Sequence, residues 1–293
     1  MMSFHGLLVL DKPSGITSRE ALDRAARWFP RRTKLGHAGT LDPLATGVLV
    51  FAVGQATRLL EYVQAMPKVY RTRVRLGATS DTDDADGTVT ENPGAAPVDE
   101  AAVRAALVSF VGELEQVPPA YSAAHVDGKR AYDLARNGGE VALTPRRVRI
   151  DRIDVRSYAW PELELDIACG KGTYIRSIAR DLGVKLGVGG YVTVLRRLRI
   201  GPFYADEAVT LDADAEAARK KLLPMVAAVS GMPAVRITAD EARRLWHGQA
   251  IPATGDGEVA VLDEAGGLVA VGRVAAGILR PEKVVRMNDD STG

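Results

Sequence analysis

Residues 36–49 read Gly36-His37-Ala38-Gly39-Thr40-Leu41-Asp42-Pro43-Leu44-Ala45-Thr46-Gly47-Val48-Leu49 and form the most unusual stretch of this 293-residue sequence. The stretch combines three glycines, a histidine and an Asp-Pro pair. Glycine lets a backbone bend tightly and approach a ligand closely. Because Pro43 restricts the preceding residue to extended geometry, the Asp42 carboxylate projects from a defined backbone. Taken alone, the stretch favours a structural turn in which Asp42 bonds neighbouring amides.

Several chemistries are excluded by spacing. The stretch has neither the G-x-G-x-x-G pattern nor the G-K-[ST] ending of nucleotide-binding loops, and the sequence has no G-x-S-x-G elbow of a serine hydrolase. His37 has no second histidine or thiolate at metal-ligand spacing, so we predict no metal site. The acidic segment 81–86 does not fit an EF-hand, because aligning Gly87 with the loop glycine puts Thr82 first and Pro93 last.

The composition is that of an ordinary globular protein, with 46% hydrophobic and 26% charged residues. No apolar run approaches the roughly 18 to 20 residues that a membrane helix needs. Residues 1–10 lack the basic flank and long apolar stretch of a secretory signal. The single cysteine, Cys169, cannot form an internal disulfide, which is typical of a reducing compartment. We therefore expect a cytoplasmic protein that does not enter membranes.

The net charge of +1 argues against a polycation that coats nucleic acid, although basic residues are clustered locally. The clusters lie at 24–34, 68–75, 146–152 and 196–199, and acidic residues gather at 81–86, 206–216 and 256–264. If the basic clusters share one face, they could neutralise phosphates. A solvated surface of mixed charge explains the same pattern equally well.

Hydrophobic periodicity predicts the elements around residues 36–49. Residues 6–10 form an apolar strand that ends at the turn Asp11-Lys12-Pro13-Ser14-Gly15. Thr17 and Glu20 have the spacing of a capping box. The helix that they open is expected to end at Pro30 and to bury Leu22, Ala25, Ala26 and Phe29.

Further along the chain, residues 69–76 and 163–169 alternate as half-exposed strands do. After the turn 170–173, an amphipathic helix is predicted from the spacing of Ile175, Ile178, Ala179 and Leu182. Strands and helices do not alternate regularly, as they would in a parallel sheet. We therefore predict an α+β fold with a mixed, largely antiparallel central sheet flanked by helices.

A second, β-rich unit is predicted to begin near Pro233. Thr238 and Glu241 form another capping box, and Gly248 is placed to end that helix. Residues 259–262 and 268–271 read as a hairpin. We expect a first domain at 1–230 and a small C-terminal module at 231–293.

Four blocks, in order, resemble the motifs of the TruB family of tRNA pseudouridine synthases, which modify the uridine in the T loop of tRNA. They are residues 10–15, residues 36–49, residues 68–77 with the acidic segment to Gly87, and residues 172–178 with 195–198. Residues 121–123 and 128–132 resemble the family's RNA-gripping loop, at about 119–147. The resemblance runs from about Gly6 to Gly201, and the C-terminal module loosely resembles a PUA-like RNA-binding domain. His125 departs from the family pattern, where a lysine is expected.

The resemblance implies a catalytic role for Asp42, as the nucleophile or base that starts cleavage of the uracil–ribose C–N bond. Arg176 would pair with Asp42 and keep it ionised. Tyr70 would stack on the uracil, with its hydroxyl as a candidate acid or base. Without the resemblance, Tyr70 reads as a packed core residue and Arg176 as a surface arginine. Whether Asp42 attacks C6 of the base or C1′ of the ribose stays open.

The resemblance also implies the substrate-binding residues. Tyr174 and Leu195 would line the pocket, although core packing is the default for a leucine at that place. His37 would contact the RNA where the target base is extruded. Lys12 would support the fold of the site. No metal or organic cofactor is expected. The expected partner is the T-arm of tRNA, with no DNA, no membrane, no obligate protein partner and a monomeric enzyme.

Three other functions stay open from the sequence. The first is an RNA-binding protein without catalysis, against which Asp42, Tyr70 and Arg176 argue. The second is an N-glycosidase that releases uracil and leaves an abasic site. The third is the guide-RNA-dependent relative of the family, the catalytic subunit of box H/ACA particles. The segment 121–147 favours independent action over the third.

Overall fold

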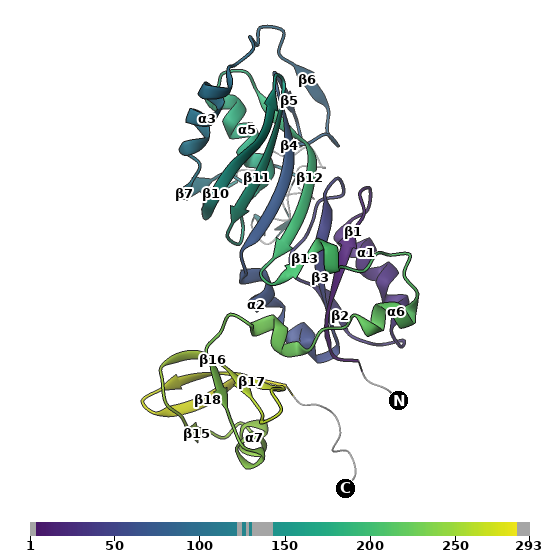
Figure 1. The fold of residues 1–293 in the computed structure, drawn as a ribbon, viewed down its shortest axis with the longest axis vertical. Coiled ribbons are helices and arrows are strands. Elements are labelled where there is room, and N and C mark those ends of the chain that lie inside the picture. Colours follow the sequence, from purple (N-terminus) through teal and green to yellow (C-terminus); the bar gives the residue numbers. More distant parts are fainter. Residues whose placement is uncertain (1–3, 122–124, 127–128, 131–142, 286–293) are drawn as a thin grey trace.

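A nine-stranded mixed sheet forms the centre of the molecule (Figure 1). The structure is a computed structural model and describes residues 4–121, 125–126, 129–130 and 143–285. The main strands run in the order β1 (Gly6–Lys12), β3 (Thr46–Val53), β12 (Gly190–Ile200), β4 (Lys68–Leu76), β11 (Glu162–Cys169), β10 (Arg146–Ala159) and β7 (Gly112–Gln116). Two short strands extend it, β2 (Leu35–His37) beside β3 and β13 (Phe203–Tyr204) beside β12.

The sheet is antiparallel except where β3 meets β12, with Arg196 opposite Thr46 and Arg197 opposite Gly47. This arrangement confirms the predicted mixed, largely antiparallel sheet. The strands predicted at 6–10, 69–76 and 163–169 are present as β1, β4 and β11, and β11 points Leu163, Leu165, Ile167 and Cys169 into the core.

Helices and short turns cover both faces of the sheet. The helices are α1 (Ser18–Ala25), α2 (Leu60–Ala65), α3 (Glu100–Val108), α5 (Ile175–Lys185) and α6 (Ala215–Lys220), with the 3-10 turns η1 (Ala26–Trp28), η2 (Gly54–Leu59), η3 (Ala205–Glu207) and η4 (Met225–Val229). Small two-stranded sheets are formed by β5 (Ala78–Ser80) with β6 (Val89–Glu91), and by β8 (His125–Val126) with β9 (Lys129–Arg130). In Figure 1, α3 and α5 lie beside the β10–β11–β4 part of the sheet, and α1 and α6 lie beside β1 and β3.

Strand β3 is buried on both faces, which explains its uninterrupted apolar run. Leu49, Phe51 and Val53 join the core cluster that includes α1 and α5. Their neighbours Val48, Val50 and Ala52 join the opposite cluster, formed with η2, α2 and η4. A strand covered on both sides shows a continuous apolar run in place of alternation. The segment that follows Asp42 is therefore anchored on both sides.

The predicted first helix is correct at its start and wrong at its end. Thr17 and Glu20 form the capping box, and Leu22, Ala25 and Phe29 are buried. Ala26 is exposed, however, and Trp28 is buried in its place. The helix tightens into the 3-10 turn η1 at Ala26, and a tighter turn changes the angle between successive side chains. The indole N–H of Trp28 then donates to the Ala213 carbonyl at 3.0 Å.

A five-stranded sheet follows residue 233 (Figure 1). It contains β14 (Ala234–Arg236), β15 (Ile251–Pro252), β16 (Gly257–Leu262), β17 (Leu268–Ala275) and β18 (Ile278–Val284), with helix α7 (Ala239–Trp246) against it. The Thr238–Glu241 capping box and the β16–β17 hairpin are confirmed. Val271 and Val285 pack with the η2–α2 segment, where Arg58 Nη1 donates to the Val284 carbonyl at 2.8 Å.

Gly47 is required where β3 and β12 run parallel. Its φ is 98°, and a Cβ added there would lie 2.2 Å from the Arg197 carbonyl oxygen. We expect Gly47→Ala to lower the free energy of unfolding by at least about 2 kcal/mol, because strain and overlap add. Urea denaturation measures it. Gly231→Ala is the control, because an added Cβ meets nothing within 4 Å there. Equal stability of the two variants would contradict the role given to Gly47.

Candidate active site

The loop that carries Asp42 is tied to the turn between β1 and α1. Ser18, which is 1% exposed, exchanges two hydrogen bonds with the Leu41 backbone: its hydroxyl accepts from the amide at 2.8 Å and donates to the carbonyl at 3.1 Å. The Gly15 amide donates to the Pro43 carbonyl at 2.9 Å. Residues on both sides of Asp42 are thus fixed by Gly15, in the family-like block at residues 10–15, and by Ser18 at the start of α1.

Lys12 is fully buried at the centre of this junction. Its Nζ donates to the carbonyls of Pro13 at 2.8 Å, Ile16 at 2.7 Å and Pro43 at 3.3 Å. Burial lowers the pKa of Lys12 to about 8, while the nearby Asp42 carboxylate opposes that shift. The hydrogen bonds of Lys12 are all to backbone carbonyls, and the one to Pro43 fixes the Asp42 loop.

Arg176 joins the Asp42 loop to a second acidic segment. It lies in the first turn of α5, and its side chain is 4% exposed. The guanidinium Nε lies 3.0 Å from Asp42 Oδ2, an ion pair in which the N–H is not aligned for a hydrogen bond. Nη1 lies 3.2 Å from Asp84 Oδ2. Nη1 and Nη2 also donate to the carbonyls of Thr82 and Tyr121, each at 2.8 Å.

Asp84 is a site residue that the sequence did not reveal. It lies in the acidic segment that failed the EF-hand register, and it is 3% exposed. Its second oxygen accepts from the Thr82 hydroxyl at 2.7 Å and from the Asp86 amide at 3.1 Å. A buried guanidinium needs a negative charge beside it. The acidic segment 81–86, inside one of the family-like blocks, was the sequence signal that could have pointed to Asp84. Asp84 and Asp42 thus both lie within ion-pair distance of the Arg176 guanidinium.

The protonation of Asp42 reflects opposing influences. Withdrawal from water raises the pKa of Asp42 above its ordinary value, and the Arg176 guanidinium lowers it in opposition. The Asp84 carboxylate raises it further. Because 33% of the Asp42 side chain is still exposed, solvent tempers the effect of burial. Arg176 is therefore the group that most favours the ionised carboxylate.

Tyr70 and Leu195 lie in the same core cluster as Leu41, which precedes Asp42. Tyr70 is 8% exposed on β4, opposite Ile167 and Arg197, and Leu195 is 6% exposed on β12. Burial raises the pKa of Tyr70, so its hydroxyl stays protonated at neutral pH. The Asp42 carboxylate also raises the pKa of Tyr70, so the two predicted site residues influence each other electrostatically.

Tyr174 is half-buried and directly precedes α5. Its backbone is held on both sides by Gln116, which is 2% exposed: the Gln116 amide oxygen accepts from the Tyr174 N–H at 2.7 Å, and the amide nitrogen donates to the Tyr174 carbonyl at 3.0 Å. Gln116 is a second residue that the sequence did not single out. It fixes the start of the helix that carries Arg176.

His37 lies at the end of the short strand β2, opposite Phe51 of β3. Burial lowers the pKa of His37, and the Arg197 guanidinium lowers it further. The imidazole is therefore neutral at pH 7. The gripping loop expected at about 119–147 is only partly described: 122–124, 127–128 and 131–142, and the side chain of His125, lie outside the described residues.

No group of three or more His, Cys, Asp or Glu side chains among the described residues could hold a metal ion. Within the same residues, no helix has the length and apolar character to cross a membrane.

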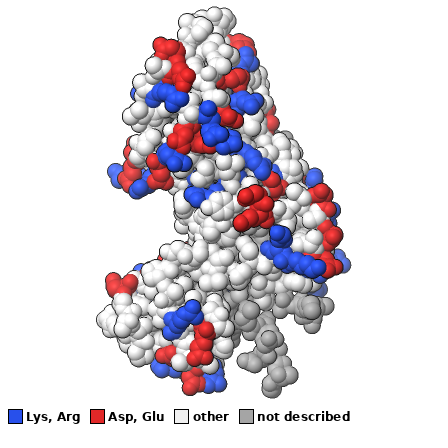
Figure 2. Space-filling model, viewed as in Figure 1, with Lys and Arg blue, Asp and Glu red and all other residues white. Residues whose placement is uncertain are grey.

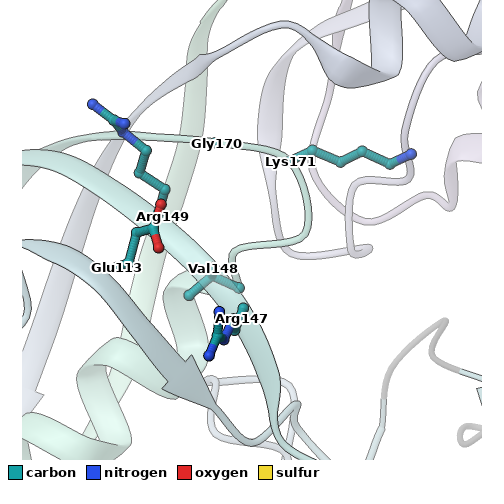
Figure 3. Close-up of a pocket in the computed structure, with 6 residues that line it drawn as sticks. All are labelled: Glu113, Arg147, Val148, Arg149, Gly170 and Lys171. Carbon is teal, nitrogen blue, oxygen red and sulfur yellow. The ribbon is translucent and has the colours of Figure 1, made fainter.

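On the face drawn in Figure 2, Lys and Arg are interspersed with Asp and Glu, so this face fits the mixed-charge alternative. An open cleft near the sheet edge is lined by Glu113, Arg147, Val148, Arg149, Gly170 and Lys171. In it, Arg149 and Lys171 point away from each other (Figure 3).

Family models for three successive segments match almost the whole chain. Residues 27–175 match the N-terminal domain of TruB family pseudouridylate synthase. Residues 176–230 match the C-terminal domain of tRNA pseudouridylate synthase B, and residues 232–286 match the C-terminal model of tRNA pseudouridine synthase II. The chain belongs to the TruB family. It is accordingly a pseudouridine synthase, and the family resemblance is confirmed.

Individual relatives agree with the family models. A protein named tRNA pseudouridine synthase B from Thermobifida fusca is 43% identical over 286 residues, which cover 94% of this chain and 97% of the relative. A protein of the same name from Gluconacetobacter diazotrophicus is 46% identical over 255 residues, covering 84% and 82%.

Two solved structures share the fold. A Cbf5-Nop10-Gar1 complex contains a chain that is 28% identical to this one, with a TM-score of 0.74 and coverage of 95% of this chain and 84% of that chain. An H/ACA RNP bound to a substrate RNA containing 2'-deoxyuridine contains one that is 25% identical, with a TM-score of 0.74 and coverage of 97% and 86%. The expected pseudouridine synthase fold is confirmed.

The buried Lys12 predicts a pH-dependent difference in stability. A folded pKa of about 8, against 10.5 for a free lysine, means that the unfolded chain binds the proton more tightly between those values. The cost of burying the charge is present in full below pH 8 and is lost as the pH rises toward 10.5. From pH 8 to 10, the free energy of unfolding of the wild type should rise by about 2 to 3 kcal/mol relative to that of Lys12→Met.

Urea denaturation of both proteins at several pH values measures this gain. The similarly lowered pKa of Lys68 is present in both proteins and cancels in the difference. A difference that does not change between pH 8 and 10 would show that Lys12 is not a buried cation.

Asp84 is predicted to support catalysis by positioning Arg176. Asp84→Asn keeps the shape of the side chain and removes one of the two carboxylate charges beside the Arg176 guanidinium. We expect the single-turnover rate of pseudouridine formation to fall about 10- to 100-fold. Asp83→Asn is the matched control, since Asp83 pairs with Arg180 at 3.0 Å in the same turn. Equal effects of the two substitutions would contradict a specific role for Asp84.

Proposed function

We propose that the protein isomerises a uridine in the T loop of tRNA to pseudouridine, with Asp42 acting on a base turned out of the RNA. The observation that carries the proposal is the Asp42 carboxylate 3.0 Å from a buried, fixed Arg176. Membership of a family of pseudouridylate synthases supports the reaction. The substrate is supported by relatives that bear the name tRNA pseudouridine synthase B.

The chemistry needs a carboxylate that can bond reversibly to carbon. Asp42 attacks either C6 of the ring or C1′ of the ribose, and the N1–C1′ bond breaks. The detached uracil turns, C5 bonds to C1′, the C5 proton leaves and N1 gains a proton. The bond to Asp42 breaks again, so atoms and electrons balance. Neither a metal nor an organic cofactor is needed.

The other site residues have supporting roles in the proposal. Arg176 keeps Asp42 ionised in a partly dry pocket. The ring of Tyr70 stacks on the uracil, while Tyr174 and Leu195 line the pocket that keeps the freed base in place. His37, neutral at pH 7, contacts the RNA where the base has left. Lys12 supports the Asp42 loop through the Pro43 carbonyl.

The proposal divides the chain into a catalytic domain at 1–230, with an RNA-gripping loop at about 119–147, and a PUA-like RNA-binding module at 231–293. It takes the protein to act in the cytoplasm as a monomer on the T-arm. The likeness to chains of Cbf5 complexes and H/ACA particles favours one competitor, an enzyme that needs a guide RNA and protein partners. The higher identity to proteins named tRNA pseudouridine synthase B favours independent action.

A T-arm transcript incubated with the purified protein alone tests the proposal. Carbodiimide mapping should place one pseudouridine in the T loop, with the RNA mass unchanged. A product with an abasic site would identify an N-glycosidase. No product without guide RNA and protein partners would contradict independent action on tRNA.

Asp42→Asn should abolish pseudouridine formation, because an amide cannot supply the nucleophile, and a loss of at least about 1,000-fold is expected. Its affinity for the transcript should stay within about three-fold of wild type, since the charge removed lies in the pocket and does not contact phosphates. Filter binding and single-turnover assays measure the two quantities. Full activity of Asp42→Asn would overturn the assignment.

A further inference from the structure

Arg197 is a buried cation for which neither the sequence nor the proposed function has a role. It lies on β12, opposite Tyr70 of β4 and opposite Gly47 of β3. Its residue is 1% exposed, and among the described residues no carboxylate lies within ion-pair distance of it. Arginine stays protonated in proteins, so the sheet carries a permanent positive charge beneath the Asp42 loop.

The guanidinium bonds the chain on both sides of Asp42. Nε donates to the Val48 carbonyl at 2.7 Å, and Nη2 donates to the Gly39 carbonyl at 3.2 Å. These carbonyls belong to the two arms of the loop, one before and one after Asp42. The planar fork of an arginine can hold two acceptors in fixed directions, which a lysine ammonium cannot do.

The same guanidinium acts on two other predicted site residues. Its charge opposes the effect of burial by lowering the pKa of Tyr70. It also lowers the pKa of His37. A single side chain thus contacts or polarises the Asp42 loop, Tyr70 and His37.

The surroundings show what this arrangement costs. Burying an unpaired charge is unfavourable, and an apolar residue of similar size would be the more stable choice. Gly47, with a φ of 98°, is needed so that β3 can approach the Arg197 backbone. Two unfavourable features at one point of the sheet indicate that the guanidinium is kept for the site it supports.

We propose that Arg197 is a positioning residue that fixes both arms of the Asp42 loop, so that the carboxylate is held in line with the stacked base. The proposal rests on the proposed function and deepens it. Arg197 touches neither substrate nor reacting atoms in this role. It acts through its hydrogen bonds to the Gly39 and Val48 carbonyls.

The test compares Arg197→Lys, which keeps the charge without the fork, with Arg197→Gln, which removes the charge. Single-turnover pseudouridine formation on the T-arm transcript should fall about 100-fold in both, because small displacements of reacting groups are costly. The Kd for the transcript should stay within about three-fold of wild type. Arg199→Lys is the matched control on the same strand, where the arginine contacts Tyr204 instead.

Arg197→Lys within three-fold of the wild-type rate would overturn the proposal, as would a loss of rate matched by an equal loss of RNA affinity. If Arg197→Gln does not fold, Arg197→Lys carries the rate comparison by itself. An inactive wild type would instead refute the proposed function.

A second readout does not depend on activity. Arg197 and Arg19 are the charged groups that act on His37. By NMR titration, the pKa of His37 should rise in Arg197→Gln and stay low in Arg197→Lys. An unchanged His37 in Arg197→Gln would show that the guanidinium does not face the site.

Discussion

The site depends on a buried guanidinium held between two carboxylates from separate parts of the chain. Arg176 reaches Asp42 at 3.0 Å and Asp84 at 3.2 Å, and its Nη1 and Nη2 also donate to the carbonyls of Thr82 and Tyr121. Removing one partner of a buried ion pair typically costs about 3 to 5 kcal/mol, because the other charge is left uncompensated. This requirement forces the glycine-rich loop, the acidic turn and the start of α5 to meet at one point.

The rest of the fold keeps that point rigid. Strand β3, buried on both faces, anchors the chain directly after the Asp42 loop. Lys12 at the end of β1 and Ser18 at the start of α1 hold the loop through hydrogen bonds. Gln116 fixes the backbone ahead of Arg176. Two buried cations, Lys12 and Arg197, bond backbone carbonyls of the loop or its flanks. Preorganised groups of this kind need little rearrangement when a reaction develops charge.

Local features of the fold could be predicted from the sequence, because short-range rules determine them. The two capping boxes, the alternation of β11 and the amphipathic spacing of α5 are examples. The prediction for the end of the first helix was wrong, since the switch to a 3-10 turn that buries Trp28 depends on a contact with the distant Ala213. Asp42, Arg176 and Tyr70 were identified through motif resemblance, and residue patterns alone favoured bland roles for them.

Asp84, Gln116 and Arg197 were not singled out, because their roles arise from sheet pairing and burial that no local pattern encodes. Of the adjacent Arg196 and Arg197, only Arg197 is buried, and its parallel pairing with Gly47 determines which of the two it is.

The central claim is that Arg176 holds Asp42 in its ionised form. Carbon-13 NMR titration of the Asp42 carboxyl in the wild type and in Arg176→Met tests it most directly. The pKa of Asp42 should rise further when the guanidinium is removed, and an unchanged or lower pKa would contradict the account.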